Sequence, residues 1–187
     1  FVSHNMGAIN RLCGTCVLME QGQIVEFGPT SRVVNRYLSA SAGAGGRVVF
    51  DHRTTRTGNG CYVIEWAELR NSQHREQSKF SIGEAITLAV KFHKTITPPG
   101  GLKMGITITS LDGIPIANMV DEDSGFRVND FPDHNEVAVK LRDVRLYPGT
   151  YSLGIWLGDL RSDTAYDSIA QAINFEIIGG GKLTARD

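Results

Sequence analysis

The chain has 187 residues, of which 41% are hydrophobic and 21% charged, and its formal net charge is −1. This charge offers no general electrostatic attraction for nucleic acid, and no apolar run approaches the length of a membrane span. Three cysteines are too few for a disulfide framework, which favours a reducing compartment.

Residues 1–40 predict a small unit of mixed helix and strand. The chain begins with Phe1 and no basic and apolar leader follows, so we expect a piece of a longer protein or a processed product. We expect a short helix over 6–13, a hairpin of strands over 15–20 and 23–27, and a second helix over 31–39. Forty residues cannot bury a core alone, so this unit requires a partner.

The small residues of 41–46 are typical of a linker, and 47–178 predict a β-sandwich of about eight short strands separated by turn residues. The tail, 179–187, is expected to be disordered or vector-derived. The predicted strands are Arg47–Phe50, Cys61–Leu69, Ala85–His93, Leu102–Thr109, Ile114–Val120, Glu136–Arg142, Thr150–Leu157 and Gln171–Ile178.

The clearest strand follows the turn Pro148-Gly149. Apolar residues alternate over 150–157, which predicts a half-buried strand with Leu153 and Ile155 in the core. The opposite face then carries Ser152, Gly154 and Trp156. An indole beside two very small residues forms a shallow shelf, which either a flat ring or a partner sheet could use.

The same alternation assigns outward residues on two other strands. Lys140 and Arg142 face outward from 136–142, and Asn174 and Glu176 face outward from 171–178. If these strands are neighbours of the Trp156 strand, the shared face carries an aromatic ring with amide, carboxylate and cationic groups. Such a face suits a pyranose, but the residues fit equally well a solvated sheet face or a dimer contact around Trp156.

The other residues that could carry chemistry are better explained by structural roles. Cys13 and Cys16 form a C-x-x-C pair that follows a helix rather than opening one, so we expect buried thiols without redox or metal function. The histidines lack metal-ligand spacing, and no nucleophile with a base is visible. Trp66 fits the alternation of its strand only if a bulge lies near Glu65, and we expect it in the core or an interface.

Two blocks resemble a known family. The first resembles the end of an ABC-transporter nucleotide-binding domain, in which a Ser-His pair closes the switch strand; it comprises Val2-Ser3-His4-Asn5, Ile9, Leu12-Cys13 and 17–28. The second resembles the C-terminal domain of the Wzt-like ATP-binding subunits of bacterial polysaccharide ABC exporters of the O-antigen type. Its matching pieces are 56–60, Gly83-Glu84, Asp112-Gly113, 146–153, Asp167, Ala172 and Phe175.

The resemblance implies an immunoglobulin-like antiparallel β-sandwich that binds a lipid-linked glycan before export. It further implies a homodimer, attached through the ATPase to a transmembrane permease, cytoplasmic and peripheral to the inner membrane. His4 would correspond to the switch histidine that contacts the γ-phosphate. The phosphate loop, the signature segment and the catalytic carboxylate are absent from this sequence, so we expect no ATP hydrolysis and no cofactor in the chain, ATP and Mg²⁺ belonging to the parent protein.

The resulting hypothesis is non-catalytic glycan recognition, with Trp156, Ser152, Asn174, Glu176, Lys140 and Arg142 as contact residues. No nucleic acid and no metal are expected. The alternative is a structural module that dimerises or docks the ATPase without binding glycan, and a carbohydrate-active enzyme ranks third.

Overall fold

The computed structural model describes residues 6–41, 46–98, 100–110, 113–130 and 135–180. The N-terminal unit pairs a β-hairpin with two helices, as the alternation of short apolar segments and turn residues predicts. Its elements contact one another and have few contacts with the remaining strands: α1 (Met6–Leu12), β1 (Thr15–Glu20), β2 (Gln23–Pro29) and α2 (Thr30–Ser41). Neither helix is long and apolar enough to cross a membrane.

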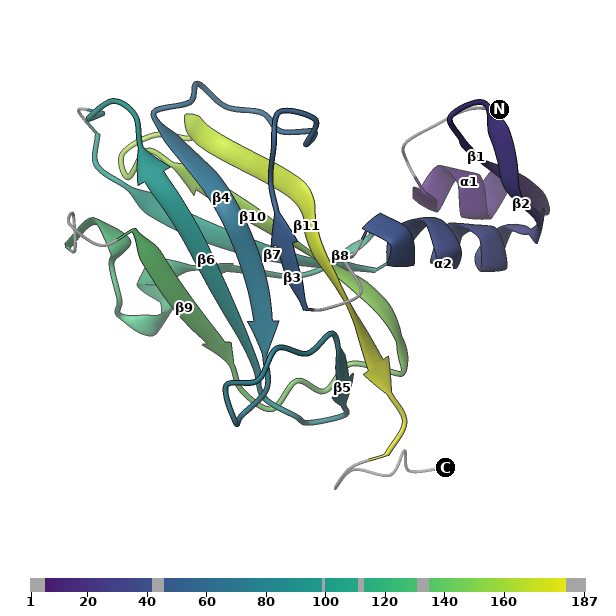
Figure 1. Ribbon diagram of the computed structural model, residues 1–187. Helices are drawn as coiled ribbons and strands as arrows, with labels where there is room; N and C mark the ends of the chain where they lie inside the picture. The colour runs from purple at the N-terminus through teal and green to yellow at the C-terminus, as the bar shows by residue number, and fades with distance from the viewer. Residues whose placement is uncertain (1–5, 42–45, 99, 111–112, 131–134, 181–187) are drawn as a thin grey trace.

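The rest of the described chain forms two sheets that face each other, with α1 and α2 set to one side (Figure 1). The four-stranded sheet is antiparallel. In spatial order it contains β3 (Arg47–Val49), β4 (Tyr62–Arg70), β6 (Ile86–Lys94) and β9 (Glu136–Leu141).

The five-stranded sheet is antiparallel except at one edge, where β5 runs parallel to β11. Two short 3₁₀ turns, Asp121–Ser124 and Val128–Asp130, follow β8. The strands, in spatial order, are β5 (Lys79–Ser81), β11 (Ala165–Ile178), β10 (Gly149–Gly158), β7 (Lys103–Ser110) and β8 (Pro115–Val120).

The core lies between the two sheets and comes from alternate residues of their strands. Phe80, Phe92, Leu153 and Phe175 are almost wholly buried there. This arrangement confirms the predicted β-sandwich and the alternation on which the prediction depended.

Three details differ from or extend the sequence prediction. The strand β11 begins at Ala165, six residues before the expected start at Gln171, because the pairing shifts from Ile173 to Ile169 and interrupts the alternation. The short strand β5 was not predicted. The expected bulge in β4 is confirmed, since the register shifts between Ile64 and Trp66.

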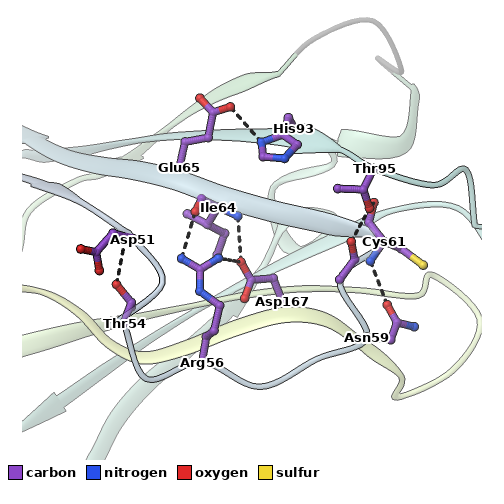
Figure 2. Close-up of polar contacts among 11 residues, drawn as sticks. Asp51, Thr54, Arg56, Asn59, Cys61, Ile64, Glu65, His93, Thr95 and Asp167 are labelled. Atoms are coloured by element: carbon purple, nitrogen blue, oxygen red, sulfur yellow. Dashed lines mark hydrogen bonds and ion pairs between the residues drawn. The ribbon is translucent and has the colours of Figure 1, made fainter.

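A loop before β4 ties the two sheets together. The guanidinium of Arg56 lies 3.0 Å from Oδ2 of Asp167 on β11, and the Ile64 N–H on β4 donates to the same oxygen at 2.8 Å (Figure 2). Gly58 in this loop has a φ of 137°, and a Cβ there would lie 2.4 Å from the Tyr166 carbonyl oxygen. The loop therefore holds the start of β11 against the opposite sheet.

Candidate functional site

The outer face of the five-stranded sheet carries a polar row that follows from the alternation of its strands. On β10, Leu153, Ile155 and Leu157 fill the core, whereas Trp156 is partly exposed on the opposite face. On β7 the core positions alternate in the same way with four outward residues: Lys103, Gly105, Thr107 and Thr109.

The strand register sets these residues side by side. Trp156 pairs with Gly105 on β7 and with Ser168 on β11, and Gly105 in turn pairs with Val120 on β8. In the next row, Gly154 and Thr107 are opposite each other. Four strands thus contribute to one continuous surface.

Small residues around Trp156 fix how its indole lies. A Cβ added at Gly158 would be 2.0 Å from Cζ2 of the indole, so the ring extends along β10 over Gly158. A Cβ added at Gly154 would be 2.7 Å from the Ala170 carbonyl oxygen, where β11 bulges toward β10. The indole is consequently packed down along its strand, with its Cε3 edge toward Gly105.

This surface is hollowed into a groove of about 630 Å³. Outward side chains of β7, β8, β10 and β11 form its floor, and the connection between β10 and β11, residues 159–163, forms a wall. On the floor, the Thr107 hydroxyl donates to Oδ1 of Asn118 at 2.9 Å. The groove therefore combines an aromatic ring with hydroxyl and amide groups.

The wall of the groove is fixed by Asp159. Its Oδ1 accepts the Arg161 N–H at 2.7 Å, and its Oδ2 accepts the Tyr166 hydroxyl at 2.8 Å. Both hydrogen bonds lower the pKa of Asp159, and the one from the Arg161 N–H has the larger effect. Burial, aided by the hydrogen bond to Asp159, raises the pKa of Tyr166. The turn that follows Asp159 is thus anchored to a buried ring.

The charges around the groove nearly balance. The Lys103 ammonium lies 3.2 Å from Glu122, which also contacts Arg127 at 3.4 Å. Within the described chain, the side chains of Arg161 and Asp163 at the wall form no ion pair. The groove therefore offers local charges for hydrogen bonding but no strong field of one sign.

The structure brings some of the predicted contact residues near Trp156. Ser152 and Asn174 pair across β10 and β11 on the same face, but they are only 3% and 9% exposed. The Ser152 hydroxyl is buried without a hydrogen bond among the described residues. Glu176 lies farther along β11, where its carboxylate is 2.9 Å from Lys79 at the sheet edge. Of these residues, only Trp156 lines the groove.

The prediction that Lys140 and Arg142 share the Trp156 face is wrong. Lys140 lies on β9 and Arg142 directly follows it, in the four-stranded sheet, whereas Trp156 lies in the five-stranded sheet. Alternation assigned the inward and outward residues of that strand correctly, but it could not tell which sheet the strand joins. His4 lies outside the described residues.

Sequence reasoning missed most residues of the groove. The alternation over 102–109 assigns Gly105 and Thr107 to the outward face, so this strand could have been included on the same grounds as Trp156. The wall residues Arg161 and Asp163 lie in a turn and carry no periodic pattern, so no sequence signal of this kind marks them.

Other clusters of polar or reactive side chains in the described chain give weaker evidence of a functional site. No group of three or more potential metal ligands is present among these residues. Cys13 and Cys16 are free thiols, and Cys16 Sγ lies 3.3 Å from the Thr30 hydroxyl. On the other sheet, His93 Nδ1 is 2.9 Å from a Glu65 carboxylate oxygen on an open strand face (Figure 2).

Comparison with known proteins gives one family. A family model described as the Wzt C-terminal domain matches residues 53–185. The crystal structure of the C-terminal domain of Wzt has a TM-score of 0.57 and 18% identity, covering 71% of this chain and 82% of that one. A search of the curated proteins finds no match.

Two further solved structures have lower similarity. The CARDB domain of a Pyrococcus furiosus protein has a TM-score of 0.35 and 11% identity, covering 66% of this chain and 100% of that one. The soluble domain of PmoD from Methylocystis sp. has a TM-score of 0.35 and 11% identity, and the match covers 70% of this chain and 100% of that one. The family match over residues 53–185 and the sandwich fold place the chain in the Wzt C-terminal domain family, non-catalytic C-terminal domains of ABC-exporter ATP-binding subunits.

Proposed function

We propose that the sandwich binds a polysaccharide in the groove on the outer face of the five-stranded sheet. The observation that carries this proposal is the Trp156 indole, which lies along β10 beside Gly105 in a groove of about 630 Å³. The apolar C–H face of a pyranose stacks on such a ring. Its hydroxyls can exchange hydrogen bonds with Thr107, Asn118 and the wall residues.

Binding at one groove should be weak. Each sugar hydroxyl exchanges hydrogen bonds with water for hydrogen bonds with protein, and the net gain of each exchange is small. A homodimer that presents two grooves to one repetitive polymer would raise the overall affinity through avidity. A dimer therefore forms part of this proposal.

The family provides the wider setting of the proposed function. In this proposal residues 1–40 are the end of the nucleotide-binding domain, where ATP and Mg²⁺ bind in the parent protein. The subunit is cytoplasmic and peripheral to the inner membrane through its permease partner. Glycan binding in the groove would couple recognition of a lipid-linked chain of the O-antigen type to its export.

Titration of the chain with a defined polysaccharide tests the proposal. The probe is the water-soluble polysaccharide released by mild acid from the lipopolysaccharide of the producing bacterium. Calorimetry and the Trp156 indole NMR resonance should both report saturable binding. Trp156→Ala should weaken binding by about 1.5 kcal/mol or more, because the stacking surface is lost.

Trp66 offers a matched control. It lies on the other sheet with the Arg47 guanidinium 4.3 Å from its ring centroid, so Trp66→Phe should leave binding unchanged. A chain that dimerises but shows no polysaccharide-dependent change would favour the alternative, a structural docking module. Release of shortened sugar products would instead favour a carbohydrate-active enzyme.

A further inference from the structure

Thr107 and Asn118 form an accessible polar pair on the floor of the groove. They are directly opposite each other on β7 and β8, and both line the groove. The Trp156 indole covers Gly105, two residues earlier on β7, and Gly105 is buried. Thr107 is half-buried and Asn118 is exposed. These two side chains are therefore polar groups that a ligand beside the indole can reach.

The hydrogen bond between the two side chains fixes what each one offers. The Thr107 hydroxyl donates its proton to Oδ1 of Asn118 at 2.9 Å, and this is the one side-chain hydrogen bond of either residue within the described part of the chain. On its other side Thr107 pairs with Gly154, which has no side chain to compete for the hydroxyl. The pair thus presents a free acceptor, Thr107 Oγ1, beside a free donor, the N–H groups of Asn118 Nδ2.

A free donor beside a free acceptor is complementary to one hydroxyl group. A sugar hydroxyl can accept from Asn118 Nδ2–H and donate its own proton to Thr107 Oγ1. The hydroxyl, the amide and Thr107 then form a closed ring in which each group donates once and accepts once, and such bonds strengthen one another. An ether or ester oxygen at the same place can accept but cannot donate.

We infer that Thr107 and Asn118 together bind one unsubstituted hydroxyl of the polysaccharide. This inference rests on the proposed function and adds two specificity-determining residues to it. The pair lies two residues along the sheet from the row of Trp156, about 7 Å away, so a sugar stacked on the indole and the unit next to it are within reach. Glycans that carry a methyl ether or an acyl ester on this hydroxyl are excluded.

Thr107→Val and Asn118→Ala, alone and together, test the inference. Each single change breaks the same ring, so each should raise Kd for the mild-acid-released polysaccharide about fivefold, the effect of losing one net hydrogen bond. The double variant should also lose about fivefold rather than the product of the two, about 25-fold, because the residues share one hydroxyl. Calorimetry on the full chain measures Kd. The Asn118 side-chain NH₂ resonances of the unaltered chain should shift on saturation.

Thr87→Val is the matched control, since Thr87 is a half-buried, outward threonine on β6 in the other sheet. It should leave Kd unchanged. Valine suits a strand and Asn118 is exposed, so no variant should change the melting temperature by more than about 4 °C.

Two results would overturn the inference: single variants that bind as tightly as the unaltered chain, or a double variant whose loss equals the product of the single losses. In either case the proposed function stands if Trp156→Ala still weakens binding. If the unaltered chain does not bind the polysaccharide, both are overturned.

Discussion

Asp167 is the buried carboxylate that joins the two sheets. It is only 3% exposed, and it accepts hydrogen bonds from Arg56 and from the Ile64 N–H. Burial raises the pKa of Asp167, and these two donors oppose the increase without cancelling it. The folded chain therefore binds the Asp167 proton more tightly than the unfolded chain does.

This difference predicts a pH dependence of stability. An unfolded aspartate has a pKa of about 3.9. Below that pH, protonated Asp167 makes its full contribution to the free energy of unfolding. The effect is lost as the pH rises through the higher folded pKa, because the ionised carboxylate is less well solvated in the sandwich.

Asp167→Asn provides the measurement, since its amide does not titrate. The free energy of unfolding of the unaltered chain minus that of the variant should fall as the pH rises above about 4, then level off. Urea unfolding across this range measures both values. A difference that rises with pH would mean that Arg56, rather than burial, dominates the pKa of Asp167.

Gly158 sets the position of the indole in the groove. A methyl group at this position would overlap the ring, and the ring must move because the backbone of a central strand cannot. Gly158→Ala should therefore shift the Trp156 indole N–H resonance and weaken polysaccharide binding, at a stability cost of about 1–3 kcal/mol. NMR and calorimetry check these outcomes, and an unshifted resonance with unchanged affinity would contradict them.

At the scale of the elements, alternation predicted strands well and predicted sheet membership poorly. The strands β6, β7 and β10 match the expected ranges to within one or two residues, because large apolar residues alternate with polar or small ones along each strand. The sheet that β9 joins depends on pairing between distant residues, which no local pattern contains. For the same reason, the sequence could place Trp156 on an outer face but could not show that Gly105 and Ser168 lie beside it.

The turn before β10 is held by a tyrosine. The Tyr151 ring stacks on Phe175 in the core, and its hydroxyl donates to the Tyr147 carbonyl oxygen at 2.8 Å. A tyrosine that bonds back to the chain a few residues upstream is a known device of immunoglobulin-like sandwiches. It fixes the Pro148-Gly149 turn and hence the start of the strand that carries Trp156.

Tyr151→Phe should remove this hydrogen bond and keep the packing of the ring. The expected loss is about 1 kcal/mol of unfolding free energy, the net value of one such bond. Denaturant unfolding measures it, with Tyr147→Phe as the control because that side chain is 81% exposed. Equal stability of Tyr151→Phe and the unaltered chain would show that the turn holds without the hydroxyl.

At the scale of the molecule, the chain is a sandwich with a self-sufficient core joined to a unit that lacks one. Every member of the main hydrophobic core comes from the strands and loops of the sandwich. The N-terminal unit instead exposes large apolar side chains: Leu12 is 71%, Ile24 67% and Phe27 63% exposed. Such a surface is typical of a unit that packs against further protein.

This division predicts the behaviour of a shortened chain. A protein consisting of residues 46–180 retains both sheets, the Arg56–Asp167 contact and the groove, so it should fold alone. Its melting temperature should lie within about 4 °C of the full chain, because the removed contacts contribute little to the sandwich core. The full chain should also bind more of a dye that reports exposed apolar surface.

Calorimetric melting and polysaccharide titration of the two proteins check this prediction together. Unchanged Kd in the shortened chain would place recognition wholly within the sandwich, as the proposed groove requires. A large fall in melting temperature would mean that α2 stabilises the five-stranded sheet. In that case the N-terminal unit and the groove would share part of their stability, and binding at one would alter the other.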